Sequence, residues 1–96
     1  MGLAALDGKH FDDSYRQKQV DRAIERAFKR LPPKGKCCAK LSIDGMHLSF
    51  HHYQHTLLYY DLARGQPIMT WSELPTDRRI LRAALANLQA THGVKK

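Results

Sequence analysis

A spacing of three or four residues between hydrophobic positions predicts a helix from Asp12 to Leu31. Its buried stripe consists of Val20, Ala23, Ile24, Ala27, Phe28 and Leu31. Three residues at its start, Asp12, Asp13 and Ser14, have side chains suited to cap the first turn. Pro32-Pro33 then ends the helix, because proline has no N–H to donate.

The same spacing predicts a second helix that opens at Pro75-Thr76-Asp77 and ends near Gly93. Thr76 is the expected N-cap of this helix. Its apolar stripe consists of Ile80, Leu81, Ala84, Leu85 and Leu88. The chain therefore has one amphipathic helix near each end.

Between the helices, hydrophobic and polar residues alternate, which predicts strands. A first strand covers residues 37–43, with Ala39, Leu41 and Ile43 on its buried face. Asp44-Gly45 favours a tight turn, after which the alternation resumes in residues 46–51.

Residues 56–62 and 67–71 favour a second hairpin, because tyrosine and other strand-forming residues are frequent there. A helix over residues 46–62 is the alternative. Its apolar face would consist of Met46, Phe50, Tyr53, Leu57 and Tyr60.

These elements predict an α+β fold, in which an N-terminal helix precedes an antiparallel sheet of three or four strands and a C-terminal helix follows it. Both helices are expected to pack on one face of the sheet. The whole chain, residues 1–96, is expected to form a single domain, with residues 1–11 and 93–96 flexible. The other sheet face would present Lys40, Ser42, His47, Ser49, His51 and Tyr53.

The 16 Lys and Arg residues exceed the 9 Asp and Glu residues, which gives a net charge of +7. The excess lies in residues 1–36 and 72–96, whereas residues 37–71 are balanced. Such a charge favours a polyanionic partner, either nucleic acid or an acidic protein surface.

The expected contact residues fall into three groups. The first helix and the loop after it supply Arg22, Arg26, Lys29, Arg30, Lys34 and Lys36, together with Lys18 at the same spacing. The start of the last helix supplies Arg78, Arg79 and Arg82, and the sheet face supplies His47, His51 and Tyr53. The competing interpretation is a solvated surface on which Glu25 pairs with Lys29, and Glu73 and Asp77 pair with the arginines.

Four histidines, His47, His51, His52 and His55, lie close together between Asp44 and Asp61. No HExxH sequence or paired CxxC accompanies them, so no metal or other cofactor is expected. The two cysteines, Cys37 and Cys38, are adjacent and do not form a disulfide framework. Neither a cysteine–histidine pair nor a histidine–aspartate pair has a spacing that identifies a catalytic site.

We therefore expect a small, basic, non-enzymatic binding or regulatory protein associated with nucleic acid. One alternative is a protein-binding module or inhibitor, of the kind that mobile elements encode, acting on a larger complex. A second alternative is a small metal-dependent hydrolase that uses the histidine cluster. A cytoplasmic location is expected, because no apolar stretch approaches the roughly 18 residues of a membrane span and the start lacks a signal-peptide pattern.

The predicted order of helix, three strands and helix, with basic residues opening the last helix, resembles a double-stranded RNA-binding domain. Asp44-Gly45-Met46-His47 falls in the corresponding first hairpin. The resemblance is one of topology, since the lysine-rich opening of the last helix and the glycine-proline turn of that family are missing from this sequence. It therefore implies no role for any particular residue.

Overall fold

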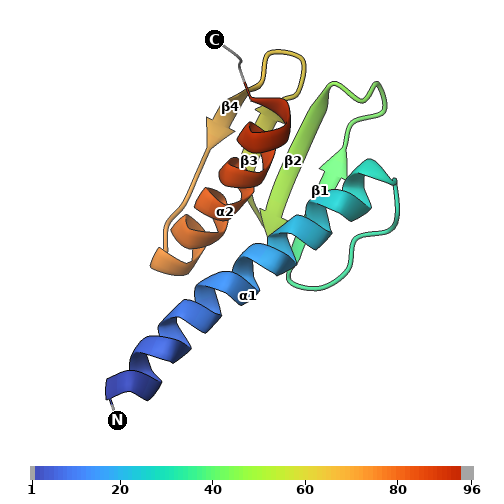
Figure 1. Ribbon diagram of the computed structural model, residues 1–96. Coiled ribbons are helices and arrows are strands. Elements are labelled where there is room, and N and C mark those ends of the chain that lie inside the picture. Colours follow the sequence, from blue (N-terminus) through green and yellow to red (C-terminus); the bar gives the residue numbers. More distant parts are fainter. Residues whose placement is uncertain (1, 94–96) are drawn as a thin grey trace.

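The computed structural model describes residues 2–93, and the side chains of residues 15–93. Its elements are α1 (Gly2–Phe28), β1 (Cys37–Leu41), β2 (His47–His52), β3 (His55–Asp61), β4 (Gln66–Thr70) and α2 (Pro75–His92). The strands form one antiparallel sheet in the order β1-β2-β3-β4, and both helices pack on the same face of it (Figure 1). The predicted α+β architecture is confirmed, with four strands.

The helix α1 begins at Gly2 and not at Asp12, so Asp12, Asp13 and Ser14 lie inside it and do not cap it. Its first half extends beyond the sheet (Figure 1). The expected flexibility of residues 1–11 stays a prediction. At the other end, Arg30 has a φ of 56°, and this left-handed conformation stops the helix just before the two prolines.

The two helices run in the same general direction, because successive residues of α1 contact successive residues of α2. The Gln17 amide donates to the Ala83 carbonyl at 3.1 Å, and the Asn87 amide donates to the Asp21 carboxylate at 2.8 Å. Near the ends of the helices, the rings of Phe28 and His92 stack with their centroids 5.1 Å apart. These contacts make the helices one continuous layer over the sheet (Figure 1).

The connection between β1 and β2 is longer than the predicted tight turn. Ile43, expected to be buried, lies in this loop and is 98% exposed, because β1 already ends at Leu41. Asp44 holds the loop by accepting hydrogen bonds from the Ser42 hydroxyl and the Met46 N–H. The Ser42 hydrogen bond lowers the pKa of the Asp44 carboxyl. Only Gly45 of the Asp-Gly pair has a positive φ, 75°.

Residues 46–62 form strands and not the alternative helix. A bulge opposite Phe50 and His51 inserts one extra residue in β3. Leu57 and Leu58 are consequently both fully buried, although they are neighbours in the sequence. The predicted second hairpin is confirmed as β3 and β4. The fourth strand distinguishes the chain from the three-strand order that its sequence resembles.

The core lies between the helix layer and the sheet. Its large, fully buried side chains are Val20, Leu48, Phe50, Leu57, Leu58, Tyr60 and Leu88. Alanines at 23, 27, 39, 83 and 84 let the helices approach each other and β1 closely. Burial raises the pKa of the Tyr60 phenol, whose hydroxyl lies 3.5 Å from the His92 carbonyl.

The helix α2 has the predicted extent, but Leu74 is its N-cap residue and not Thr76. Of the C-terminal residues expected to be flexible, 94–96 lie outside the described residues. Neither helix, over its described residues, combines the length and the hydropathy that a membrane span requires.

Candidate nucleic-acid interface

The outward face of α1 carries exposed cations. Lys18, Arg22 and Lys29 are all exposed and lie opposite the buried Val20 and Ile24. Lys18 and Arg22 are about one helical turn apart, roughly 6 Å along the axis, and Lys29, directly after the end of the helix, follows roughly 10 Å further on. Of the predicted basic stripe on this helix, Lys18, Arg22 and Lys29 are therefore turned toward water.

One acidic residue, Glu25, shares this face. Its carboxylate lies 3.3 Å from the Lys29 ammonium, which is the pairing expected by the competing interpretation. Both side chains are well exposed, so this ion pair contributes little to stability. Lys29 is thus partly compensated, whereas Lys18 and Arg22 have no carboxylate within 4.0 Å in the described part of the chain.

The start of α2 adds Arg78, Arg79 and Arg82, which are all exposed. Among the residues with described side chains, none of these arginines has a carboxylate within 4.0 Å. Because α2 packs beside α1 on the same sheet face, the arginines belong to the same helix layer as Lys18 and Arg22 (Figure 1). We refer to Lys18, Arg22, Arg78, Arg79 and Arg82 as the helix-layer cations.

Asp77, expected to neutralise these arginines, instead points into the protein. It is 3% exposed, and His52 Nδ1–H donates to its Oδ1 at 2.9 Å. Its other oxygen accepts from the Leu74 N–H at 3.3 Å, which caps the first turn of α2. The hydrogen bond from His52 lowers the pKa of the Asp77 carboxyl, so the group is ionised at neutral pH but unavailable to the arginines.

Other carboxylates are also engaged within the protein. Asp21 accepts from Gln17 at 2.9 Å and from Asn87, and Asp61 accepts from the Arg64 N–H at 3.0 Å. The Arg64 side chain lies 3.8 Å from Asp61, in the loop between β3 and β4. The helix-layer cations therefore keep their charge uncompensated by the described side chains.

Arg26 and Arg30, two predicted contact residues, have structural partners. The Arg26 guanidinium donates twice to the Pro32 carbonyl, at 2.9 and 3.2 Å. The Arg30 guanidinium donates to the carbonyls of Ser42 and Ile43, at 3.0 and 3.2 Å. These hydrogen bonds hold the following loops against the end of α1. Neither arginine is counted among the helix-layer cations.

Tyr53, predicted to lie on the open sheet face, is instead in the turn between β2 and β3. Its φ of 57° turns the chain, and its ring is 59% exposed. The ring lies 4.6 Å from that of His52, and the Lys36 ammonium is 6.0 Å from its centroid. Lys34 and Lys36 both lie in the loop between α1 and β1, outside the helices.

The open sheet face does carry Lys40, His47, Ser49 and His51, as predicted. Both His51 ring nitrogens are occupied, by the Ser49 hydroxyl at 3.0 Å and the Thr56 hydroxyl at 3.1 Å. Burial lowers the pKa of His51, and the Lys40 ammonium acts in the same direction. His51 is consequently neutral at pH 7 and adds no charge to a site for an anion.

The histidines do not gather into a metal centre. His47 stacks on Tyr59 at 5.4 Å, whereas His52 binds Asp77 and His55 packs against Trp71 at 5.2 Å. In the part of the chain that the structure describes, no three His, Cys, Asp or Glu side chains are placed to hold an ion. Burial, together with Cys38, raises the pKa of the Cys37 thiol, which disfavours the nucleophilic thiolate.

The sequence patterns did not indicate the Asp77–His52 pair. The Leu-Pro-Thr-Asp order signals only the bond from Asp77 back to the Leu74 N–H, since proline suits the first helical position and an aspartate two residues later can accept from the cap residue, and it carries no sign of His52. The chain as a whole matches no protein-family model, no curated protein and no solved structure.

Proposed function

We propose that this chain is a non-enzymatic protein that binds nucleic acid through the outward surface of α1 and α2. The observation that supports this proposal is the set of exposed helix-layer cations with no described carboxylate within 4.0 Å. The phosphate backbone is the ligand that suits such a surface, because each neutralised phosphate releases condensed counterions.

Two features favour phosphate contacts over base reading. The cations come from two helices that lie side by side, so they form a broad surface and not a single helix tip (Figure 1). Arginine also binds phosphate with two parallel hydrogen bonds, and four of the five helix-layer cations are arginines. We therefore expect binding with little dependence on base sequence.

A salt titration tests the proposal. Binding of a fluorescent 16-base-pair DNA duplex is measured by anisotropy between 50 and 200 mM salt, for the wild type and two variants. One variant neutralises the helix layer with Lys18→Gln, Arg22→Gln and Arg82→Gln. The other removes the same number of charges elsewhere, with Lys36→Gln, Lys40→Gln and Arg64→Gln.

The helix-layer variant is expected to bind more weakly and to lose about 2 to 3 units of the slope of log affinity against log salt, since each phosphate contact contributes about 0.9. The control variant is expected to keep the wild-type slope to within about one unit. Equal losses in the two variants would refute the helix-layer site, and a wild type that binds neither DNA nor RNA duplexes would refute the function.

A further inference from the structure

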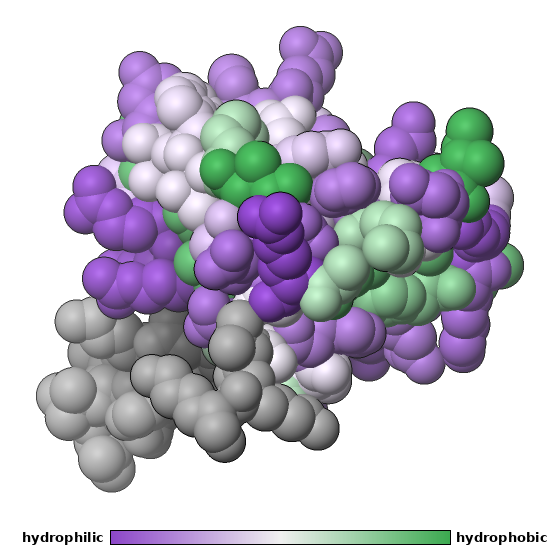
Figure 2. Space-filling model, turned by 90° about the horizontal axis from the view of Figure 1, so that it is seen from above, coloured by the Kyte–Doolittle hydropathy of each residue, from purple (hydrophilic) through white to green (hydrophobic). Residues whose placement is uncertain are grey.

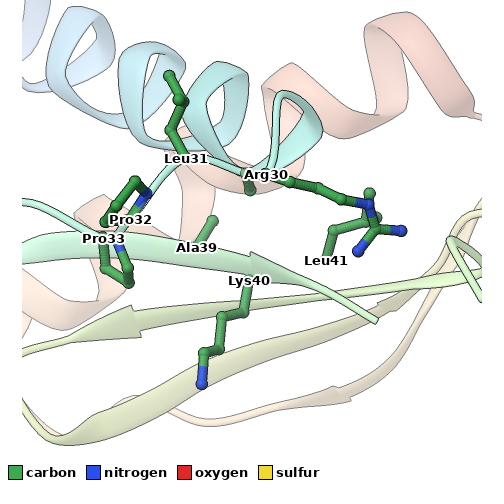
Figure 3. A pocket seen from close by; sticks show the side chains of 8 residues that line it. Arg30, Leu31, Pro32, Pro33, Ala39, Lys40 and Leu41 are labelled. Carbon is green, nitrogen blue, oxygen red and sulfur yellow. The ribbon is translucent and has the colours of Figure 1, made fainter. Parts of the chain in front are cut away.

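A groove runs between the end of α1 and the strand β1, on the side of the molecule where β1 is the edge of the sheet (Figure 3). It has a volume of about 290 Å³. Its apolar wall is formed by Leu31, Pro32, Pro33, Ala39 and Leu41. We call this feature the β1 groove. Lys40 projects from the strand on the side away from α1, whereas Arg30 extends past Leu41 (Figure 3).

The main chain along this groove has unused hydrogen-bonding groups. Two hydrogen bonds lie at the ends of the pairing of β1 with β2. The Ser42 N–H donates to the His47 carbonyl at one end, and the Tyr53 N–H donates to the Lys36 carbonyl at the other. Because alternate residues of an antiparallel strand bond to the same neighbour, the N–H and C=O groups of Cys37, Ala39 and Leu41 point away from β2. No hydrogen bond from a described residue reaches them.

Exposed apolar side chains lie near this edge. Ile43, two residues after the end of β1, is 98% exposed, and Leu31 at the groove is 44% exposed. The face of the molecule shown in Figure 2 is mainly hydrophilic, with hydrophobic residues in separate patches. The apolar residues at β1 line a single strip, which an extended segment fits better than a broad apolar partner.

The charges around the groove specify the chemistry of that partner. Arg30 and Lys40 line it, Lys34 and Lys36 lie in the segment that joins α1 to β1, and the sequence has no Asp or Glu between Arg26 and Ile43. A second copy of β1 on this edge would bring like charges together, which disfavours self-pairing. A partner that carries acidic side chains would be attracted.

We infer that β1 pairs with an extended peptide segment of a partner protein in which apolar and acidic residues alternate. Main-chain bonds to Cys37, Ala39 and Leu41 supply the strand pairing. Side chains on the α1 side of the added strand fill the apolar groove, and those on the other side meet Lys40, because strand side chains alternate between the faces. This interaction uses a different surface from the helix-layer cations.

The test uses a synthetic eight-residue peptide of alternating valine and glutamate, with a valine–lysine peptide for comparison. Binding to the full chain is followed by amide NMR and by hydrogen exchange. The valine–glutamate peptide is expected to bind with a Kd below about 1 mM and to protect the amides of Cys37, Ala39 and Leu41 from exchange. The valine–lysine peptide is expected to bind at least 10-fold more weakly.

Two variants locate the interaction. Leu41→Pro removes one outward N–H at the half-buried end of the edge strand, where proline is tolerated, and should weaken peptide binding about 10-fold. Lys40→Glu, at an exposed site, should reverse the preference toward the valine–lysine peptide, whereas Arg64→Glu should leave it unchanged.

Three results would each overturn the inference. They are no binding at 1 mM peptide, NMR chemical-shift changes confined to the helix layer, and an unchanged peptide preference in Lys40→Glu. Protection of the Cys37, Ala39 and Leu41 amides by DNA or RNA, and not by peptide, would also overturn it and assign the groove to nucleic acid. The helix-layer variant should bind the valine–glutamate peptide like the wild type, so a failure of the proposed function leaves this test intact.

Discussion

Replacing Asp77 with alanine is expected to lower Tm by about 10 °C or more at pH 7. The substitution removes the acceptor for His52 and the group that caps α2 at Leu74, and both contacts lie inside the protein. It leaves the polar His52 ring largely buried without its partner, which costs more than the loss of an exposed contact. Circular dichroism melting curves measure the effect.

The control for this prediction is Glu73→Ala, which removes the same charge from an exposed side chain near the same helix end. Its Tm should stay within about 2 °C of the wild type. A combined His52→Ala and Asp77→Ala variant should be less destabilised than the sum of the single changes, because the two groups contact each other. An Asp77→Ala protein that melts like the Glu73→Ala control would contradict the role given to this pair.

The same pair gives a pH dependence. Because the pKa of Asp77 is lower in the folded chain than the usual 3.8, the folded state favours the carboxylate. Its contribution to stability is complete above pH 3.8 and is lost as the pH falls from 3.8 through the pKa of the folded state. The Asp77→Ala variant should lack this part of the acid sensitivity.

Reversing two charges of the helix layer, with Arg79→Glu and Arg82→Glu, is expected to reduce affinity for a DNA duplex by about 100-fold at low salt. Each reversal removes a phosphate contact and adds a repulsion. Both arginines are exposed and have no carboxylate partner among the described side chains, so the variant should fold like the wild type. Anisotropy titration gives the affinity and melting curves give the stability.

The matched control places the same two reversals elsewhere, as Lys40→Glu and Arg64→Glu on the open sheet face and in the β3–β4 loop. Its affinity should fall by less than about 10-fold, through net charge alone. If both double variants lose affinity equally, the cations act only through the overall charge of the protein, and the helix layer is not the binding surface.

Periodicity predicted the fold well where side chains decide it. Val20, Ile24 and Ala27 mark the buried stripe of α1, and the alternation of Leu48 and Phe50 with polar residues marks β2. Such patterns are readable because burial on one face fixes which positions must be apolar. The exposure of Lys18 and Arg22 follows from the same rule.

Features set by the main chain or by distant contacts were not predictable in this way. The bulge that buries both Leu57 and Leu58 breaks the alternation, and Tyr53 adopts a conformation that few residues other than glycine favour. The binding of Arg26 and Arg30 to carbonyls depends on where the following loops run. The partnership of Asp77 with His52 joins residues 25 positions apart, which no local pattern encodes.

The most direct test of the proposed interface is to map the contacts of a 16-base-pair DNA duplex on the folded chain by amide NMR. The predicted result is perturbed signals from residues 18–28 of α1 and 78–82 of α2, with unchanged signals from Lys40, Ser49 and Tyr59. Perturbations centred on the open sheet face, or spread evenly over all basic residues, would contradict it.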